Sequence, residues 1–118
     1  MQPFTVTILG CGAAVPTASH LCSSQVLALR NKNYMIDCGE GTQYQLRRMK
    51  FHFGRLGHIF ISHLHGDHWF GLPGLVSSFG LEGRGEQLHI HAPARLEGTM
   101  NHLLQTYCPG LGFEVVFH

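Results

Sequence analysis

The stretch HIFISHLHGDHWFGLPGL, from His58 to Leu75, places three histidines and one aspartate within the six residues from His63 to His68. The apolar run before this cluster predicts a buried strand, and the glycines and proline after it predict a turn into a helix. Imidazole nitrogens and carboxylate oxygens are ligands that suit zinc and related divalent ions. Polar groups crowded behind a buried strand cost stability unless something satisfies them, so a metal site explains the cluster better than ordinary histidines do.

The spacing of the cluster indicates two ions. Residues two apart in an extended loop face the same way, so His63 and His65 can bind one ion together. Asp67 and His68 follow Gly66 and can bind a second ion. A side chain at Gly66 would crowd the approach to the site, and glycine tolerates any backbone conformation that the turn needs. Two ions about 3.5 to 4 Å apart can share a water, lower its pKa towards about 7 and clamp a phosphodiester. The sequence has no G-x-S-x-G or catalytic-cysteine motif, so the pattern favours metal-assisted hydrolysis.

The other histidines give weaker indications of metal binding. His89 and His91 share one face of a predicted strand and could bind metal, but packing within the sheet is the favoured interpretation. The remaining histidines are treated as ordinary residues: His20, His52, His58, His102 and His118.

Strand and helix patterns alternate along the rest of the chain, which favours an α/β layered fold. The predicted strands are 4–10, 26–29, 34–36, 58–62, 87–93 and 113–117, with 26–36 as a hairpin. The predicted helices are 39–50 and 94–107, and residues 69–83 are expected to form a glycine-interrupted helix or two short pieces. Thr42 is expected to cap the first of these helices, with Glu40 at its positive end.

Length and composition indicate the number of domains, the extent of burial and the location of the protein. A length of 118 residues is typical of one domain. Only 13% of residues are charged against 44% hydrophobic, which indicates a large buried fraction or an exposed face awaiting a partner. A net charge of +1 excludes a global basic field for nucleic acid. Four cysteines without a C-x-x-C pair are interpreted as reduced thiols, and no segment resembles a signal or membrane span, so a cytoplasmic location without membrane contact is expected.

Several motifs resemble a known family. SHLHGDH is similar to the H-x-H-x-D-H signature of the metallo-β-lactamase superfamily. Together with LGCGAAVPT, DCGEGTQYQL and the GDH-x-x-GLPGL extension, it resembles the amino-terminal half of the ribonuclease Z family, from about Thr7 to about Leu104. The resemblance implies a metallo-β-lactamase fold, an αββα sandwich, of which residues 1–118 would form the amino-terminal portion of a single domain: one mixed sheet with flanking helices.

The resemblance also implies roles for individual residues. His63 and His65 would bind the first zinc, and Asp67 and His68 the second. Asp67 would also act in catalysis, orienting the attacking hydroxide or passing a proton to the departing ribose oxygen. Asp37 would support the metal-binding loop without itself binding the metal, although a turn or capping role is an alternative. The residues that would bind phosphate are Gly39, Gly41 and Thr42. A plain turn is the alternative explanation for them. The implied substrate is precursor tRNA, which loses its 3′ trailer, and the full-length protein would be a homodimer.

The sequence departs from the family pattern in two respects. PTASHLCSS, residues 16–24, stands where many members have P-x-K-x-R-N, so lysine and arginine contacts to tRNA are missing. The family's remaining metal ligands lie beyond His118, so we expect a truncated or proteolysed product that is inactive and binds metal weakly alone. The alternatives are a hydrolase of small phosphodiesters or aryl sulfates with the same fold, and a non-catalytic α/β module that self-associates.

Overall fold

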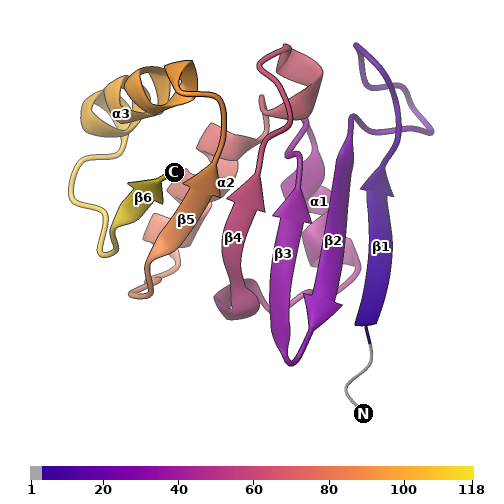
Figure 1. Ribbon diagram of the computed structural model, residues 1–118, viewed down its shortest axis with the longest axis horizontal. Helices are drawn as coiled ribbons and strands as arrows, with labels where there is room; N and C mark the ends of the chain where they lie inside the picture. The colour runs from indigo at the N-terminus through magenta and orange to yellow at the C-terminus, as the bar shows by residue number, and fades with distance from the viewer. Residues whose placement is uncertain (1–3) are drawn as a thin grey trace.

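Alternating apolar runs form the six strands of one mixed sheet, as the computed structural model of residues 4–118 shows (Figure 1). The strands are β1 (Phe4–Gly10), β2 (Ser24–Leu29), β3 (Lys32–Ile36), β4 (Leu56–Phe60), β5 (Leu88–His91) and β6 (Val115–Phe117). The helices are α1 (Thr42–Arg48), α2 (Leu72–Leu81) and α3 (Arg95–Tyr107), and two 3-10 turns are η1 (Phe53–Arg55) and η2 (Gly66–His68). The predicted α/β fold is confirmed.

The strand order is the same in the sheet as in the sequence, from β1 to β6. Strands β1, β2 and β3 pair antiparallel, whereas β3 through β6 pair parallel. Each parallel step is bridged by one helix, and α1 and α2 lie behind the sheet in Figure 1. The carboxyl ends of the parallel strands therefore meet along one edge, where open α/β sheets place their ligands.

The core lies between the sheet and the helices. Inward-facing residues of the central strands, such as Met35, Ile59 and Ile90, are fully buried. They pack against α2 and α3, which contribute Phe79 and Met100. This layer fixes β3 and β4 side by side, and so fixes the two loops that follow them.

The opposite face of the sheet carries exposed apolar side chains. Phe4, Val6 and Ile8 of edge strand β1 are each more than half exposed, at 59%, 55% and 52%, and Phe60 of β4 is 38% exposed. Such a face is one of the two alternatives that the low charged fraction of the sequence indicated, the other being a large buried fraction. Separately, no helix among residues 4–118 is long and apolar enough to cross a membrane.

Two helices differ from their predicted form. Residues 72–81 make one uninterrupted helix, because Pro73 lies in the first turn, where its missing amide costs nothing. Helix α1 starts at Thr42, after Gly41 with a φ of 88°. The Thr42 hydroxyl donates to the carbonyl of Gly39 at 2.7 Å instead of accepting a helix amide, so the predicted cap is wrong. Glu40 precedes the helix and is not part of its first turn.

Candidate metal centre

The histidine cluster lies at the carboxyl edge of the sheet, directly after β4. The ring centroids of His63 and His65 are 4.9 Å apart, and those of His63 and His68 are 3.7 Å apart. Nε2 of His68 lies 3.4 Å from Oδ2 of Asp67. The four predicted metal ligands therefore form one chain of neighbouring side chains, in the order His65, His63, His68 and Asp67.

Asp37 joins this cluster from the neighbouring strand. It follows β3, is 4% exposed, and has a φ of 61°, which turns its carboxylate toward the loop after β4. Ser62 donates to it through its amide at 2.8 Å and through its hydroxyl at 2.9 and 3.0 Å. Nδ1 of His68 donates to Oδ2 of Asp37 at 2.6 Å.

The bond to Asp37 determines which nitrogen of His68 can bind a metal. A carboxylate only accepts hydrogen bonds, so Nδ1 of His68 carries a proton, and Nε2 is the ring nitrogen that can offer a lone pair to a metal. Histidines that bind metals commonly donate their second ring nitrogen to a carboxylate in this way. Asp37 thus contacts the cluster as the resemblance implied, and it fixes the orientation of the His68 ring.

Asp67 is held from the glycine-rich loop after β1. The amide of Ala14 donates to its Oδ2 at 3.0 Å. This hydrogen bond is the main reason why the pKa of Asp67 lies below its ordinary value. Burial acts in the opposite direction, and the neighbouring His68 and His63 lower the pKa by smaller amounts. Asp67 is therefore an anionic oxygen donor next to three imidazoles.

The donor set fits part of a zinc site. Among residues 4–118, no three side chains of His, Cys, Asp or Glu converge closely enough to hold an ion by themselves. A catalytic zinc usually takes about three protein ligands. His63 with His65, and Asp67 with His68, supply nitrogen and oxygen donors in pairs, so each ion would need further ligands.

Two glycines allow the loops beneath the cluster to touch. A Cβ on Gly39 would lie 2.5 Å from the carbonyl oxygen of Asp67, and one on Gly71 would lie 2.2 Å from the carbonyl oxygen of Gly39. Gly66 was expected both to avoid crowding by a side chain and to allow an unusual backbone conformation. Its φ is not positive, and a Cβ there would crowd the Phe70 ring at 2.3 Å.

The predicted phosphate-binding residues are engaged within the protein. The amide of Gly39 donates to the carbonyl of Ser23 at 3.0 Å, and that of Thr42 donates to the carbonyl of Gly39 at 3.2 Å. The amide of Tyr44 donates to Gly41. These bonds favour the alternative, a plain turn, because the amides of Gly39 and Thr42 already have acceptors.

His89 and His91 lie away from the cluster, on the open face of the sheet. Nδ1 of His58 is 3.0 Å from Nε2 of His91, and Nδ1 of His89 is 2.9 Å from Nε2 of His118. His58 and His118, which were interpreted as ordinary residues, thus contact this pair. The parallel pairing of β4 with β5 sets His58 opposite His89.

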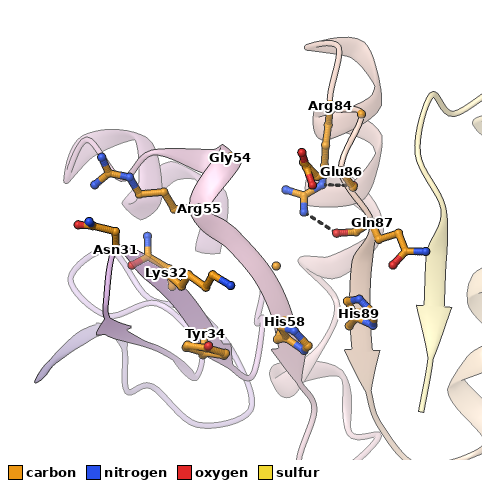
Figure 2. A pocket seen from close by; sticks show the side chains of 13 residues that line it. Asn31, Lys32, Tyr34, Gly54, Arg55, His58, Arg84, Glu86, Gln87 and His89 are labelled. Atoms are coloured by element: carbon orange, nitrogen blue, oxygen red, sulfur yellow. Dashed lines mark hydrogen bonds between the residues drawn. The ribbon is translucent and has the colours of Figure 1, made fainter.

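A hollow on the molecule also lies apart from the cluster. It has a volume of about 670 Å³ and is lined by Lys32, Tyr34, Arg55, His58 and His89 among others (Figure 2). The guanidinium of Arg84 at its rim donates to the backbone carbonyls of Glu86 and Gln87. None of the predicted site residues lines this hollow.

A smaller hollow of about 310 Å³ lies beside Asp67 and His65. Its other lining residues are Ala14, Cys22, Glu40, Gly66 and Phe70. Burial, Asp67 and Glu40 together raise the pKa of Cys22, and burial raises that of Cys38 to about 12. Both cysteines are therefore neutral thiols at neutral pH, which are poor zinc ligands and poor nucleophiles.

Comparisons with known proteins agree on the family. A family model described as Anti-Pycsar protein Apyc1 matches residues 4–111. Ribonuclease Z of Parabacteroides distasonis is 57% identical over 118 residues, which is 100% of this chain and 39% of that protein. This chain thus spans about two fifths of the length of such relatives.

Solved structures show the same fold. Human tRNase Z, short form, has a TM-score of 0.89 and 39% identity, covering 96% of this chain and 44% of that one. The metallo-β-lactamase fold protein YhfI from Bacillus subtilis has a TM-score of 0.72 and 21% identity, covering 98% and 46%, and it supports the fold alone. The chain therefore belongs to the family described by the Apyc1 model, has the metallo-β-lactamase fold, and is similar over its whole length to the amino-terminal part of ribonuclease Z.

Proposed function

We propose that the chain supplies part of the active site of a zinc-dependent endoribonuclease that removes the 3′ trailer from precursor tRNA. One observation carries the proposal: the His63–His68 cluster meets Asp37 at the ligand-binding edge of the sheet, in a chain 57% identical to ribonuclease Z. Residues 1–118 would form the amino-terminal portion of a single domain. A homodimer of the whole protein and a cytoplasmic location belong to the same proposal.

The residues divide the work of hydrolysis. His63 and His65 would hold one zinc ion, and Asp67 with Nε2 of His68 a second. When bound, two zinc ions supply Lewis acidity toward a phosphodiester and a water of lowered pKa. Asp37 keeps Nδ1 of His68 protonated, and so keeps Nε2 available. Asp67, as a carboxylate, would orient the attacking water and accept its proton, or pass that proton on to the ribose oxygen as the bond from phosphorus to this oxygen breaks.

A chimera makes the proposal testable in a complete protein. In it, residues 1–118 replace the matching 39% of Parabacteroides distasonis ribonuclease Z. The substrate is a precursor tRNA with a 3′ trailer, and cleavage is followed by gel electrophoresis. We expect zinc-dependent cleavage at the trailer junction.

Two variants of the chimera locate the chemistry. Asp67→Ala should lower kcat by more than about 100-fold, because even outer partners of metal ligands are worth about 10- to 100-fold. His89→Ala, on the open face, should change kcat by less than about threefold. Equal losses in the two variants would mean that the active-site assignment is wrong.

The alternative with the same fold is a hydrolase of small phosphodiesters or aryl sulfates. A chimera that cleaves bis(p-nitrophenyl) phosphate or p-nitrophenyl sulfate, but leaves precursor tRNA intact, would support that alternative. The similarity of the whole chain to proteins named ribonuclease Z favours RNA.

A further inference from the structure

The glycine-rich loop after β1 contains a strained turn that contacts Asp67. The amide of Val15 donates to the carbonyl of Ala13 at 2.7 Å, which closes a three-residue γ-turn. Ala14 is the central residue and has a φ of 63°. A γ-turn with positive φ at its centre is rare and strained, because positive φ costs conformational energy in a residue that has a Cβ.

The loop is braced at its base and tip by bonds that do not involve Asp67. The amide of Gly12 donates to the carbonyl of Leu21 at 2.7 Å. The amide of Thr17 donates to the carbonyl of His20 at 2.8 Å, and the amide of His20 donates to the hydroxyl of Thr17 at 3.0 Å. These bonds brace the loop independently of the contact with Asp67.

The turn directs one amide at the candidate metal centre. Ala14 lines the hollow beside Asp67 and His65, and its amide donates to Oδ2 of Asp67 at 3.0 Å from 53 residues away in the sequence. The same Oδ2 lies 3.4 Å from Nε2 of His68, so the Ala14 amide anchors the carboxylate oxygen that is next to the neighbouring metal ligand. Strained backbone concentrates where a fixed geometry serves function.

We propose that Ala14 is a positioning residue for the metal centre, whose amide, directed by the strained turn, holds Oδ2 of Asp67 beside Nε2 of His68, the other ligand expected for the second zinc ion. This inference rests on the proposed function, because it assigns a role toward a metal that Asp67 would bind. The side chain of Ala14 plays no part in the role. The backbone conformation and its amide do.

Three variants of the chimera separate this role from general loop stability. Ala14→Val places a β-branched residue at positive φ, which should rearrange the turn and withdraw the amide. Ala14→Gly keeps the amide and accepts the conformation without strain. Ala13→Val adds the same bulk at an equally exposed neighbour without a positive φ, and is the matched control.

The first readout is the zinc dissociation constant, measured by competition with a chromophoric chelator. Ala14→Val should raise it about 10-fold, in the range seen when outer partners of metal ligands are lost. Ala14→Gly and Ala13→Val should leave it within about twofold, and thermal unfolding should confirm that all three are folded. In precursor tRNA cleavage, Ala14→Val should lower kcat and leave KM unchanged.

A double-variant cycle tests whether the effect passes through Asp67. In an Asp67→Ala background, Ala14→Val should change zinc affinity by less than about twofold. The inference is overturned if Ala14→Val and Ala13→Val have equal effects, or if the loss persists without Asp67. A chimera that binds zinc but spares precursor tRNA would overturn the proposed function alone, and one that binds no zinc would overturn both.

Discussion

At the residue scale, the candidate site depends on Asp37 as much as on the histidines. Its position at a φ of 61° puts a buried carboxylate between the loops after β3 and β4. One carboxylate accepts from both Ser62 and His68, so it connects the strand framework to a metal ligand. The sequence predicted Asp37 only through the family resemblance, because nothing in its local pattern separated it from a turn aspartate.

Asp37→Asn is expected to weaken zinc binding by about 10- to 100-fold in the chimera. Asparagine has the same shape and tolerates positive φ, but its amide cannot accept with both terminal atoms. The His68 ring would then lose its fixed orientation. Ser23→Ala is a suitable control, since Ser23 reaches Asp37 only at 3.4 Å. Zinc affinity that is unchanged in Asp37→Asn would contradict the positioning role of this carboxylate.

At the element scale, the loops after β3 and β4 contact one another through glycines. The carbonyl of Gly39 lies where a Cβ of Gly71 would be, and backbone there cannot yield without moving the loop. The Phe70 ring that Gly66 faces is 62% exposed and can rotate away. The two positions therefore differ in what an added methyl group displaces.

Gly71→Ala is expected to destabilise the chain by about 1 to 3 kcal/mol, the usual cost of overpacking. Gly66→Ala should cost less than Gly71→Ala, because a side chain moves instead of backbone. Urea unfolding followed by circular dichroism measures both. The account of this loop contact would be wrong if Gly66→Ala proved the more destabilising of the two.

The histidines of β4 and β5 form an acid-sensitive part of the sheet. His58 stacks on His89 with centroids 4.6 Å apart, and His91 stacks on His118 at 4.4 Å. Burial, followed by the charges of neighbouring histidines, lowers the pKa of His58 and His91 from 6.5, and Lys32 adds to the effect on His58. The folded state therefore binds fewer protons than the unfolded state in this range.

The free energy of unfolding of the chain should consequently be fully present above pH 6.5 and fall as the pH drops below it. Replacing His58 and His91 together by Phe keeps stacked rings that cannot be protonated, and should flatten this dependence. His102→Gln, on the exposed face of α3, is the control and should leave it in place. Urea midpoints at pH 7.5 and 5.5 provide the comparison, and equal pH dependence in all three proteins would refute the explanation.

Much of the architecture could be predicted from local patterns. The strand 4–10, the hairpin and the helix through Leu96, Met100 and Leu104 followed directly from apolar periodicity. The start of α1 could not be predicted, because the Thr42 hydroxyl bonds to a carbonyl that tertiary packing places there. The metal cluster was visible because its members are neighbours in sequence. Ala14 was not, because its contact with Asp67 spans 53 residues and involves only backbone.

At the scale of the whole molecule, one face of the sheet is covered by helices and the other is open. The open face combines the apolar residues of β1 with Phe60 and the histidines of β4 and β5. Contiguous exposed apolar surface of this kind favours association, and β1 is also an edge strand with unpaired backbone groups.

The 118-residue chain by itself is expected to self-associate at high concentration through this face. Val6→Lys, on the exposed side of β1, should shift the equilibrium toward monomer. Arg95→Lys, in the first turn of α3, serves as a conservative control. Analytical ultracentrifugation over a range of concentrations measures the effect. A chain that stays monomeric throughout, or a Val6→Lys variant that associates as strongly, would contradict this reading of the face.

The proposal that the His63–His68 cluster holds two zinc ions is tested most directly by the zinc content of the chimera after exhaustive dialysis, measured by elemental analysis. We expect two zinc ions per chain. The zinc content should fall when His63, His65 and His68 are replaced together by alanine. Zinc content that is equal in the parent and in the triple variant would contradict the proposal.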